Sequence, residues 1–262
     1  MTYIMNTPEE GQRIERKTDF GLTRAQLESI GVSQGKTVLD LGCAAGTTTR
    51  IMSELVGPTG HVVGVDMSAA RVEQAIRLSA KCGNASYRVG TASALPCADG
   101  EFDITWARFL FEYLPQPVMA LEEMIRVTRR GGLVCAADLD GNCIWNFPDD
   151  PELVTDIQHT LHALGTRFDP GIGKKLFTLF VDAGLQNIKV DARIYHLIAG
   201  TIGEEQREHW MMKLDGITSA LVSSGWTAER AQTLGDRYMA HLMAPRTLTY
   251  SVLFTVCGTR VT

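Results

Sequence analysis

The stretch TVLDLGCAAGTTTR, residues 37–50, constrains the fold more than any other part of the sequence. A run of β-branched and aliphatic residues leads into a turn of glycine and alanine, and the turn leads into a helical pattern. In an open α/β sheet such a turn lies at the carboxyl ends of the strands, where free backbone N–H groups at a helix N-terminus can bind a ligand. We therefore expect an α/β sheet with a binding site at this turn.

The same strand–helix unit repeats through the first half of the chain. The expected strands are residues 37–41, 61–65, 86–92, 102–107 and 132–140, and the expected helices are 47–55, 71–81 and 118–126. This alternation predicts a parallel sheet with helices on both faces, and the nearly continuous apolar strands fit burial on both sides.

The pattern changes in the second half of the chain. We expect a helix from residue 151, a helix over 173–183, a strand over 187–198, two amphipathic helices within 201–245 and a last strand over 248–259. No internal repeat or low-complexity linker separates these segments. A length of 262 residues suits one α/β domain with a modest cap, so we expect a single domain over residues 1–262.

The composition argues against several kinds of partner. The chain has 25 basic and 30 acidic residues, a formal net charge of −5 and no block of like charge, which disfavours nucleic acid. Its six cysteines form neither a CxxC pair nor a cluster with histidine, so neither a metal site nor a disulfide framework is expected. No run of about 18 apolar residues occurs, so no membrane span is expected. These features predict a cytoplasmic protein.

The residues of the turn indicate which ligand it binds. Dinucleotide enzymes need G-x-G-x-x-G, but here Ala44 stands between Gly42 and Gly46, and Asp40 would repel a pyrophosphate. A nicotinamide-dependent oxidoreductase is therefore disfavoured, whereas Asp40 suits an ammonium group. Asp66 ends the next strand, where a carboxylate can accept both hydroxyls of a ribose. In the alternative interpretation, these carboxylates only cap nearby backbone N–H groups.

Four segments in this order and spacing, VLDLGCAAGTTT, GVDMS, ALPCADGEFDITWARFLFEYL and MIRVTRRGG, resemble the class I S-adenosylmethionine-dependent methyltransferases of the small-molecule branch. The resemblance implies a Rossmann-like sheet of seven strands, mostly parallel, with a reversed last strand. It also implies S-adenosyl-L-methionine as cofactor. The implied cofactor contacts are Asp40, Gly42, Cys43, Ala44, Gly46, Asp66, Met67, Thr91, Ala92 and Arg108.

The chain departs from the family pattern at two of these positions. Ala44 replaces the family's middle glycine, and Thr91 replaces the acidic residue that often holds the adenine amino group. A threonine hydroxyl accepts a hydrogen bond less strongly than a carboxylate does, so the adenine contact is weaker than the family's.

A reversed last strand has a consequence for the segment before it. The connection from a parallel strand to an antiparallel neighbour begins and ends at the same edge, so residues 199–247 should form a helical cap over the carboxyl edge. We expect residues 1–30 to add an N-terminal helical cap segment. Phe111, Trp210 and Tyr238 are the expected contacts to a small, mostly apolar acceptor. Alternatively, the cap's aromatic residues only pack its helices together.

The sequence offers few candidates for catalysis. Glu112, Asp138 and His162 could serve as a general base, although Glu112 could instead pair with Arg108, and Asp138 could be a loop residue at the end of the fifth strand. Methyl transfer depends mainly on positioning, which can supply about 7–11 kcal/mol, more than the roughly 10²–10⁴-fold of a base.

The expected function is methyl transfer from S-adenosylmethionine to a small, mostly apolar metabolite by in-line displacement. An S-adenosylmethionine-binding protein of the same fold, acting as a cyclase or a regulator, is the alternative. The expected partner is a small-molecule acceptor, and a homo-oligomer is compatible with the sequence.

Overall fold

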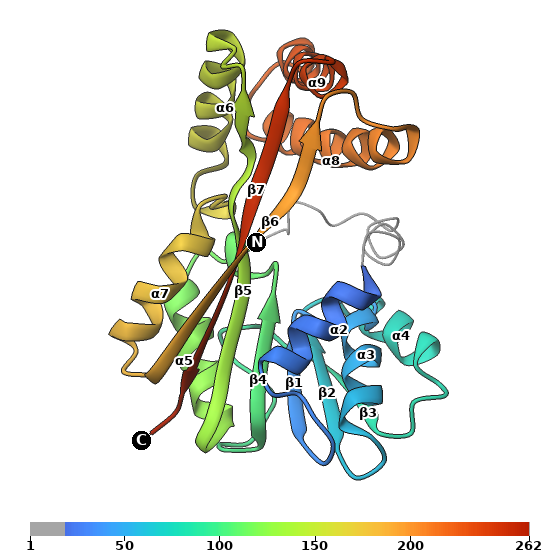
Figure 1. The fold of residues 1–262 in the computed structure, drawn as a ribbon, viewed down its shortest axis with the longest axis vertical. Coiled ribbons are helices and arrows are strands. Elements are labelled where there is room, and N and C mark those ends of the chain that lie inside the picture. Colours follow the sequence, from blue (N-terminus) through green and yellow to red (C-terminus); the bar gives the residue numbers. More distant parts are fainter. Residues whose placement is uncertain (1–18, 262) are drawn as a thin grey trace.

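The computed structural model describes residues 19–261, except for the side chains of Asn142, Cys143 and Glu205. One sheet runs through the molecule, with the strand order β3-β2-β1-β4-β5-β7-β6 (Figure 1). The strands are β1 (Thr37–Leu41), β2 (His61–Asp66), β3 (Ala85–Val89), β4 (Phe102–Arg108), β5 (Thr128–Phe147), β6 (Gln186–Ala199) and β7 (Leu248–Thr259). β1 to β5 are parallel, and β7 is antiparallel to both β5 and β6, which confirms the expected reversed last strand.

Helices pack on both faces of this sheet and at one end of it (Figure 1). They are α2 (Phe20–Ser29), α3 (Thr47–Val56), α4 (Ala69–Leu78), α5 (Pro117–Val127), α6 (Pro151–Leu164), α7 (Ile172–Asp182), α8 (Glu204–Ser223) and α9 (Ala228–Met243), with short 3₁₀ turns η1 (Phe111–Tyr113) and η2 (Gly165–Arg167). α2 and α3 bury Leu27, Ile51 and Met52 in one apolar cluster against the sheet. α5 and α7 form a second cluster on the opposite face.

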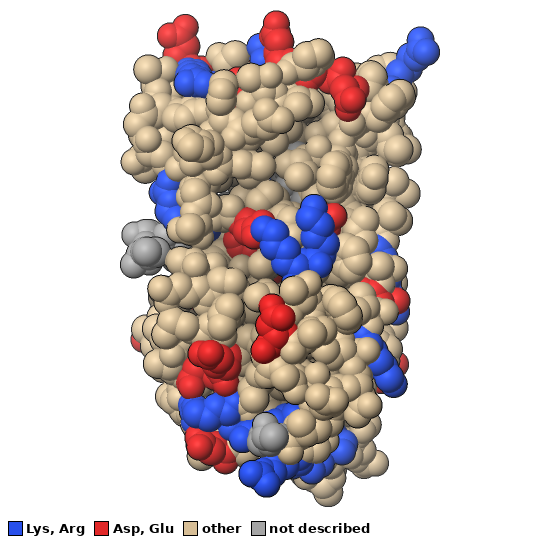
Figure 2. Space-filling view, turned by 90° about the vertical axis from the view of Figure 1, so that its left-hand side faces the viewer, with Lys and Arg blue, Asp and Glu red and all other residues tan. Residues whose placement is uncertain are grey.

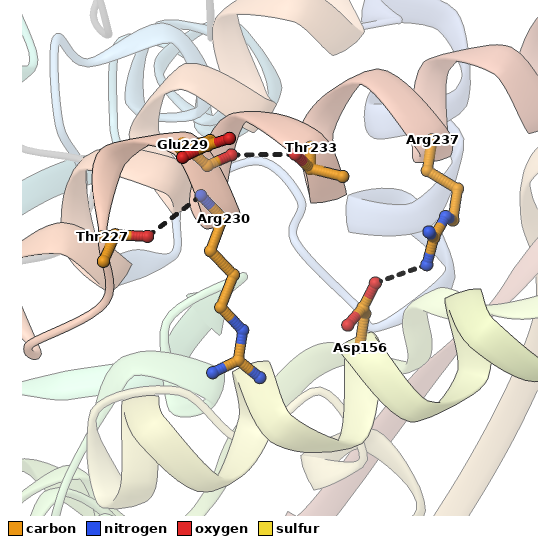
Figure 3. A pocket seen from close by; sticks show the side chains of 6 residues that line it. All are labelled: Asp156, Thr227, Glu229, Arg230, Thr233 and Arg237. Atoms are coloured by element: carbon orange, nitrogen blue, oxygen red, sulfur yellow. Dashed lines mark hydrogen bonds and ion pairs between the residues drawn. The ribbon is translucent and has the colours of Figure 1, made fainter.

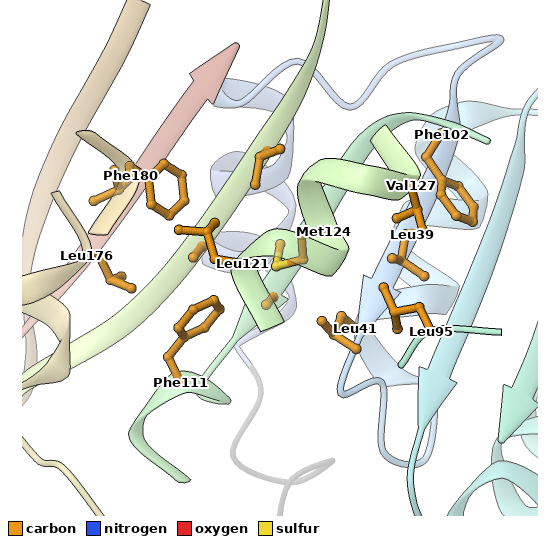
Figure 4. Packing of buried hydrophobic residues seen from close by; sticks show 14 of the residues in the cluster. Leu39, Leu41, Leu95, Phe102, Phe111, Leu121, Met124, Val127, Leu176 and Phe180 are labelled. Atoms are coloured by element: carbon orange, nitrogen blue, oxygen red, sulfur yellow. The ribbon is translucent and has the colours of Figure 1, made fainter. Parts of the chain in front are cut away.

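The second cluster is the larger core of the sheet (Figure 4). Leu121 and Met124 of α5 lie between Phe102 of β4 and Phe180 of α7, and all four side chains are fully buried. Burying a side chain of this size contributes about 1.5–3 kcal/mol relative to leaving it exposed. The alternation of apolar strands and amphipathic helices thus produces a sheet with a core on each face.

α6, α8 and α9, which we call the cap, pack together at the end of the molecule where β5, β6 and β7 extend beyond the other strands (Figure 1). The cap has its own apolar cluster, built around Leu153, Trp210, Leu221, Tyr238 and Leu242. Helices were expected in 199–247, and the structure adds α6 to them.

The expected N-terminal cap segment, residues 1–30, is described only from residue 19. Its residues 20–29 form α2, which lies on the face of the sheet with Leu27 fully buried. Gln26 Nε2 donates to Thr255 Oγ1 of β7 at 2.8 Å. The described part of this segment therefore belongs to the sheet's packing.

The expected end of the fifth strand at Asp140 is wrong. β5 continues to Phe147, because it pairs with β7 along the whole of that strand, from Leu133 opposite Thr259 to Phe147 opposite Leu248. A bulge between Asp140 and Trp145 absorbs the turn-like residues that suggested a loop. Gly141 (φ +76°) is required there, since an added Cβ would lie 1.5 Å from the Trp145 indole nitrogen.

Candidate functional site

The turn between β1 and α3 combines several residues with left-handed backbone. Gly42, Ala44 and Gly46 have φ of +77°, +47° and +79°. An alanine in this conformation costs about 1–2 kcal/mol. The Ala44 N–H donates to Asp66 Oδ2 at 3.0 Å, and this charge-assisted hydrogen bond offsets part of the strain. The turn thus holds Ala44 in a backbone conformation that usually favours glycine.

Gly46, the N-cap of α3, is also a place where neighbouring side chains approach the backbone closely. A Cβ on this residue would lie 2.5 Å from Tyr87 Oη and 3.1 Å from the Ala75 Cβ. The Tyr87 hydroxyl is held there by a 2.6 Å hydrogen bond with Ser79 Oγ. The glycine therefore allows β3 and α4 to pack directly beneath the turn.

Asp40 lies at the carboxyl end of β1 and is 3% exposed. Thr49 Oγ1 of α3 donates to its Oδ2 at 2.6 Å. Burial raises the pKa of Asp40 from 3.8 to about 6; the charge of Asp66 also raises it, whereas the Thr49 hydrogen bond and the charge of Arg108 lower it. A cation bound beside Asp40 would favour the ionised form, so this carboxyl group suits a positively charged ligand.

Asp66 joins the turn to α4. Its Oδ2 accepts from Ala44 N, and its Oδ1 accepts from Ser68 N at 2.9 Å. Ser68 itself caps α4, since its Oγ accepts from Arg71 N. Each carboxylate oxygen can accept a second hydrogen bond, so Asp66 keeps acceptor capacity for a ribose. Met67, beside it, is 58% exposed.

The loop after β3 lies against this strand end. Gly90 N donates to Asp66 O at 3.0 Å, and Ala94 N donates to Thr91 O at 3.1 Å. Thr91 is exposed, whereas Ala92 packs against the sheet core. The structure thus brings the expected Thr91–Ala92 pair to the same edge as Asp66.

Arg108 is the last residue of β4 and its guanidinium is largely buried. Its Nη1 donates to Thr23 Oγ1 at 3.0 Å, and its Cζ lies 4.6 Å from the centre of the Phe109 ring. Its Nε is buried and has no hydrogen-bond partner among residues 19–261. Burial lowers the pKa of Arg108, while the charges of Tyr195 and Asp40 raise it. A buried guanidinium with an unused donor indicates an anionic group of a ligand as its partner.

Of the expected acceptor contacts, Phe111 is 1% exposed and belongs to the sheet core in Figure 4. Trp210 and Tyr238 are each 3% exposed and contact each other in the cap cluster, with ring centres 5.6 Å apart. These three side chains therefore fill the apolar cores of the sheet and the cap.

The three candidate bases lie in two places. Glu112 and Asp138 are both buried, and Asp138 Oδ2 accepts from Glu112 N at 3.2 Å. Burial raises the pKa of Asp138 well above its ordinary range, and the charge of Glu112 raises it further. His162 lies exposed in the last turn of α6. The carboxyl pair thus joins η1 to β5.

A polar pocket of about 330 Å³ lies on the cap, between α6 and α9 (Figure 3). Arg237 pairs with Asp156 at 2.7 Å, and the Arg230 guanidinium stacks 3.8 Å from the centre of the Trp226 ring. Asp156, Arg230 and Arg237 each have a partner within the cap, so we place no ligand there.

Sequence reasoning missed the side chains that support the site. Thr23 accepts a hydrogen bond from Arg108, and Thr49 donates one to Asp40. Tyr87 lies against Gly46 of the turn. The three threonines 47–49 directly after the turn could have indicated the role of Thr49, because a hydroxyl in the first helical turn can donate to a carboxylate at the end of the preceding strand. Thr23 and Tyr87 carry no comparable local signal.

Two features are absent from the part of the chain that the structure describes. No helix there has the length and apolarity needed to cross a membrane. No group of three or more metal-ligating side chains gathers there.

The chain is similar to known methyltransferases. The family model described as Methyltransferase domain matches residues 32–215. An uncharacterised methyltransferase of Schizosaccharomyces pombe is 32% identical over 195 residues, which cover 70% of this chain and 67% of that protein. The 2-methyl-6-phytyl-1,4-hydroquinone methyltransferase of Synechocystis is 32% identical over 141 residues, covering 53% of this chain and 42% of that protein.

A third relative and a solved structure extend the comparison. An uncharacterised protein of transposon TN4556 from Streptomyces fradiae is 29% identical over 219 residues, 83% of this chain and 61% of that protein. The chain thus spans between 42% and 67% of the length of these curated relatives. The YcgJ protein of Bacillus subtilis has the same fold, with a TM-score of 0.61 at 18% identity over 93% of this chain and 98% of that one. Together with the sheet order and the turn, these matches show that the chain belongs to the class I S-adenosylmethionine-dependent methyltransferases.

Proposed function

We propose that this protein transfers a methyl group from S-adenosylmethionine to a small, mostly apolar metabolite. The observation that carries the proposal is the pair of opposite charges at the carboxyl edge of the sheet. Asp40 and Arg108 are both buried, each shifts the pKa of the other, and Arg108 keeps a buried N–H without a described partner. An amino-acid zwitterion has the complementary charges.

In this proposal each end of the cofactor has its own residues. Asp40 binds the ammonium group and Arg108 the carboxylate of the methionine moiety, over the turn Gly42, Cys43, Ala44 and Gly46. Asp66 accepts the ribose hydroxyls, and Met67, Thr91 and Ala92 lie around the adenine. Hydrogen bonds within the chain fix Asp66 to the turn and to Ser68, which reduces the ordering that binding requires.

When bound, S-adenosylmethionine supplies an electrophilic methyl group on a sulfonium. The chain's contribution is to fix the position of that group and to exclude water. Arg108 and Asp40 set the position of the methionine end. The nucleophilic atom of the acceptor gives up its proton to solvent or to a neighbouring group. We assign Glu112 and Asp138 the positioning of η1 and leave the base unassigned.

The acceptor class rests on the cap and on the relatives. The cap exposes Met211, Met212 and Met243, whose flexible side chains suit an irregular apolar ligand. The Synechocystis relative is named for a hydroquinone with an isoprenoid tail. A substrate with a ring and an apolar tail is therefore the first class to assay.

Calorimetry with S-adenosylmethionine tests the binding site directly. Arg108→Gln removes the charge but keeps hydrogen-bond donors, and we expect it to weaken binding by roughly tenfold or more, since a charge-assisted hydrogen bond contributes about 1.5–3 kcal/mol. Arg77→Gln, exposed in the last turn of α4, is the control and should bind normally. Unchanged affinity in folded Arg108→Gln protein contradicts the proposal.

Transfer needs a second measurement. The protein is incubated with methyl-labelled S-adenosylmethionine and a metabolite extract, and labelled products are identified by mass. A labelled small molecule supports the proposal. Tight binding without any labelled product supports the alternative, a cofactor-binding cyclase or regulator.

A further inference from the structure

β6 is the strand at one edge of the sheet, and most of its side chains are exposed. β7 pairs with one side of it, and no strand among residues 19–261 pairs with the other side. Every residue from Lys189 to Ile194 is exposed. A long open edge offers unpaired backbone N–H and C=O groups and is a template for pairing with another chain.

The regular part of β6 is short and symmetric. Register shifts interrupt the pairing with β7 between Gln186 and Lys189 and between Tyr195 and Ile198. A residue with positive φ lies in each shift, Asn187 at +51° and His196 at +50°. The uninterrupted stretch is therefore residues 189–195, with Ala192 at its centre.

The side chains of this stretch are complementary to themselves about Ala192. In an antiparallel pair of two copies centred there, Asp191 lies opposite Arg193 of the second copy, and Arg193 lies opposite its Asp191. Val190 lies opposite Ile194 in the same way. Cross-strand pairs of opposite charge and of β-branched residues stabilise an antiparallel pairing.

The two faces of the stretch differ in character. Val190 pairs in register with Val256, which belongs to the core under α7, so Val190, Ala192 and Ile194 lie on the face that α7 covers. Val190 and Ile194 are 48% and 58% exposed there. α7 also exposes Phe177 and Val181. Asp191 and Arg193 lie on the other face, where they form a 2.8 Å ion pair.

We propose that β6 is the interface of a homodimer, in which two copies of this chain pair β6 antiparallel about a two-fold axis at Ala192. The two sheets become one continuous sheet. Asp191 and Arg193 of the two copies form a square of alternating charges on one face. The apolar side chains of β6 meet on the other face, with one α7 helix on each side of the axis.

The occupant is a second copy, because the pattern is its own complement. A two-fold interface requires that residue i contacts residue j while j contacts i, which the pairs 191–193 and 190–194 satisfy. The centre of the charge pattern coincides with the centre of the unbulged stretch. This proposal is independent of the reaction that the protein catalyses.

Charge swaps at the two positions test the pairing. The wild-type protein is expected to sediment as a dimer, at about twice the chain mass of 28.7 kDa. Asp191→Arg places Arg opposite Arg, and Arg193→Asp places Asp opposite Asp. Each variant alone should dissociate, with a dissociation constant raised roughly tenfold to hundredfold, because both opposed pairs change sign together.

Mixing the variants gives the decisive result. An equimolar mixture of Asp191→Arg and Arg193→Asp protein restores opposite charges at both pairs and should form a heterodimer, and the double variant should dimerise with itself. Glu73→Arg, on the exposed side of α4, is the control for adding a positive charge and should remain dimeric. Circular dichroism and cofactor binding verify that each variant is folded.

Three outcomes would overturn the proposal. They are a wild-type protein that is monomeric at concentrations far above those used for the variants, single variants that stay dimeric, and a mixture that stays monomeric. The first would show that β6 does not pair with a second copy. The second would place a dimer interface elsewhere on the chain.

Discussion

The turn between β1 and α3 and the cap are stabilised in different ways. The turn depends on backbone conformation and on hydrogen bonds among Asp40, Thr49, Ala44 and Asp66. The cap depends on an apolar cluster of aromatic and aliphatic side chains. Its flank in Figure 2 carries few charges between the groups at its top and at the waist of the molecule. The turn is thus a polar, hydrogen-bonded unit, whereas the cap is held by apolar packing.

This difference has a consequence for mutations. A change in the turn should act on cofactor binding, while a change in the cap should act on the stability of the cap and on the acceptor. The two regions are joined through β5 and β7, so the separation is a matter of degree. The following predictions test how far it holds.

The largest expected effect is that of Trp210→Ala in the cap. Removing a fully packed tryptophan costs about 3–5 kcal/mol of stability. Hydrogen exchange should rise in α8 and α9 more than in α3, and S-adenosylmethionine should bind with nearly unchanged affinity. Phe180→Ala, in the sheet core, is the matched control and should raise exchange in the sheet. A clear loss of cofactor affinity in folded Trp210→Ala protein would contradict the separation between the turn and the cap.

A pair of glycines compares backbone strain in the two regions. Gly46 has φ +79°, and a Cβ added there would lie 2.5 Å from Tyr87 Oη. Gly225, between α8 and α9, has φ +97°, and a Cβ added there would have no neighbouring atom within 4 Å. Gly46→Ala should cost about 2–4 kcal/mol, from strain and overpacking together, and should weaken cofactor binding. Gly225→Ala should cost only the strain, about 1–2 kcal/mol. Chemical denaturation measures both, and similar losses would show that the close approach of Tyr87 is unimportant.

Asp40 predicts a particular pH dependence. The pKa of this carboxyl group rises from 3.8 to about 6 on folding, so the folded protein binds the proton more tightly than the unfolded chain. The free energy of unfolding of the apo protein should therefore fall as the pH rises from about 4 to above 6, by at most about 3 kcal/mol from this group. Asp40→Asn should remove that decrease and be more stable than wild type at pH 7, yet bind S-adenosylmethionine more weakly.

Denaturation curves of the two proteins at several pH values, beside binding isotherms at pH 7, check this prediction. A wild-type stability that rises through the same pH range, with no difference between the two proteins, would show that burial does not dominate at Asp40.

The last of these predictions, and the smallest in free energy, concerns Asp66→Ala. Loss of hydrogen bonds to a ribose of about 1.5–3 kcal/mol corresponds to roughly 10- to 150-fold weaker binding. Stability should also fall, because Ala44 N and Ser68 N lose their acceptors. Ser68→Ala is the control: it removes the cap of α4 and should lower stability by about 1 kcal/mol without changing affinity. A folded Asp66→Ala protein with wild-type affinity would mean that Asp66 serves only the backbone.

Much of the fold and part of the site follow from the sequence alone. The alternation of strands and helices, the turn at Gly42–Gly46 and the two helices within 201–245 were predictable, because each is encoded within a short stretch by periodicity and glycine. The reversed direction of strand 248–259 was implied by the resemblance to the methyltransferase family. Asp40 and Asp66 were predictable for the same reason, since each ends a strand at a fixed distance from the turn.

Only the tertiary structure determined what those elements contact. β5 runs past Asp140 because β7, more than 100 residues later, supplies the hydrogen bonds that its own turn-like sequence does not favour. Thr23 accepts a hydrogen bond from Arg108, and Trp210 packs against Tyr238 in the cap. In both cases the tertiary structure brings together side chains that are distant in the sequence. Local backbone preferences act over a few residues, whereas burial and strand pairing depend on which distant segments meet, and no single stretch of sequence records that.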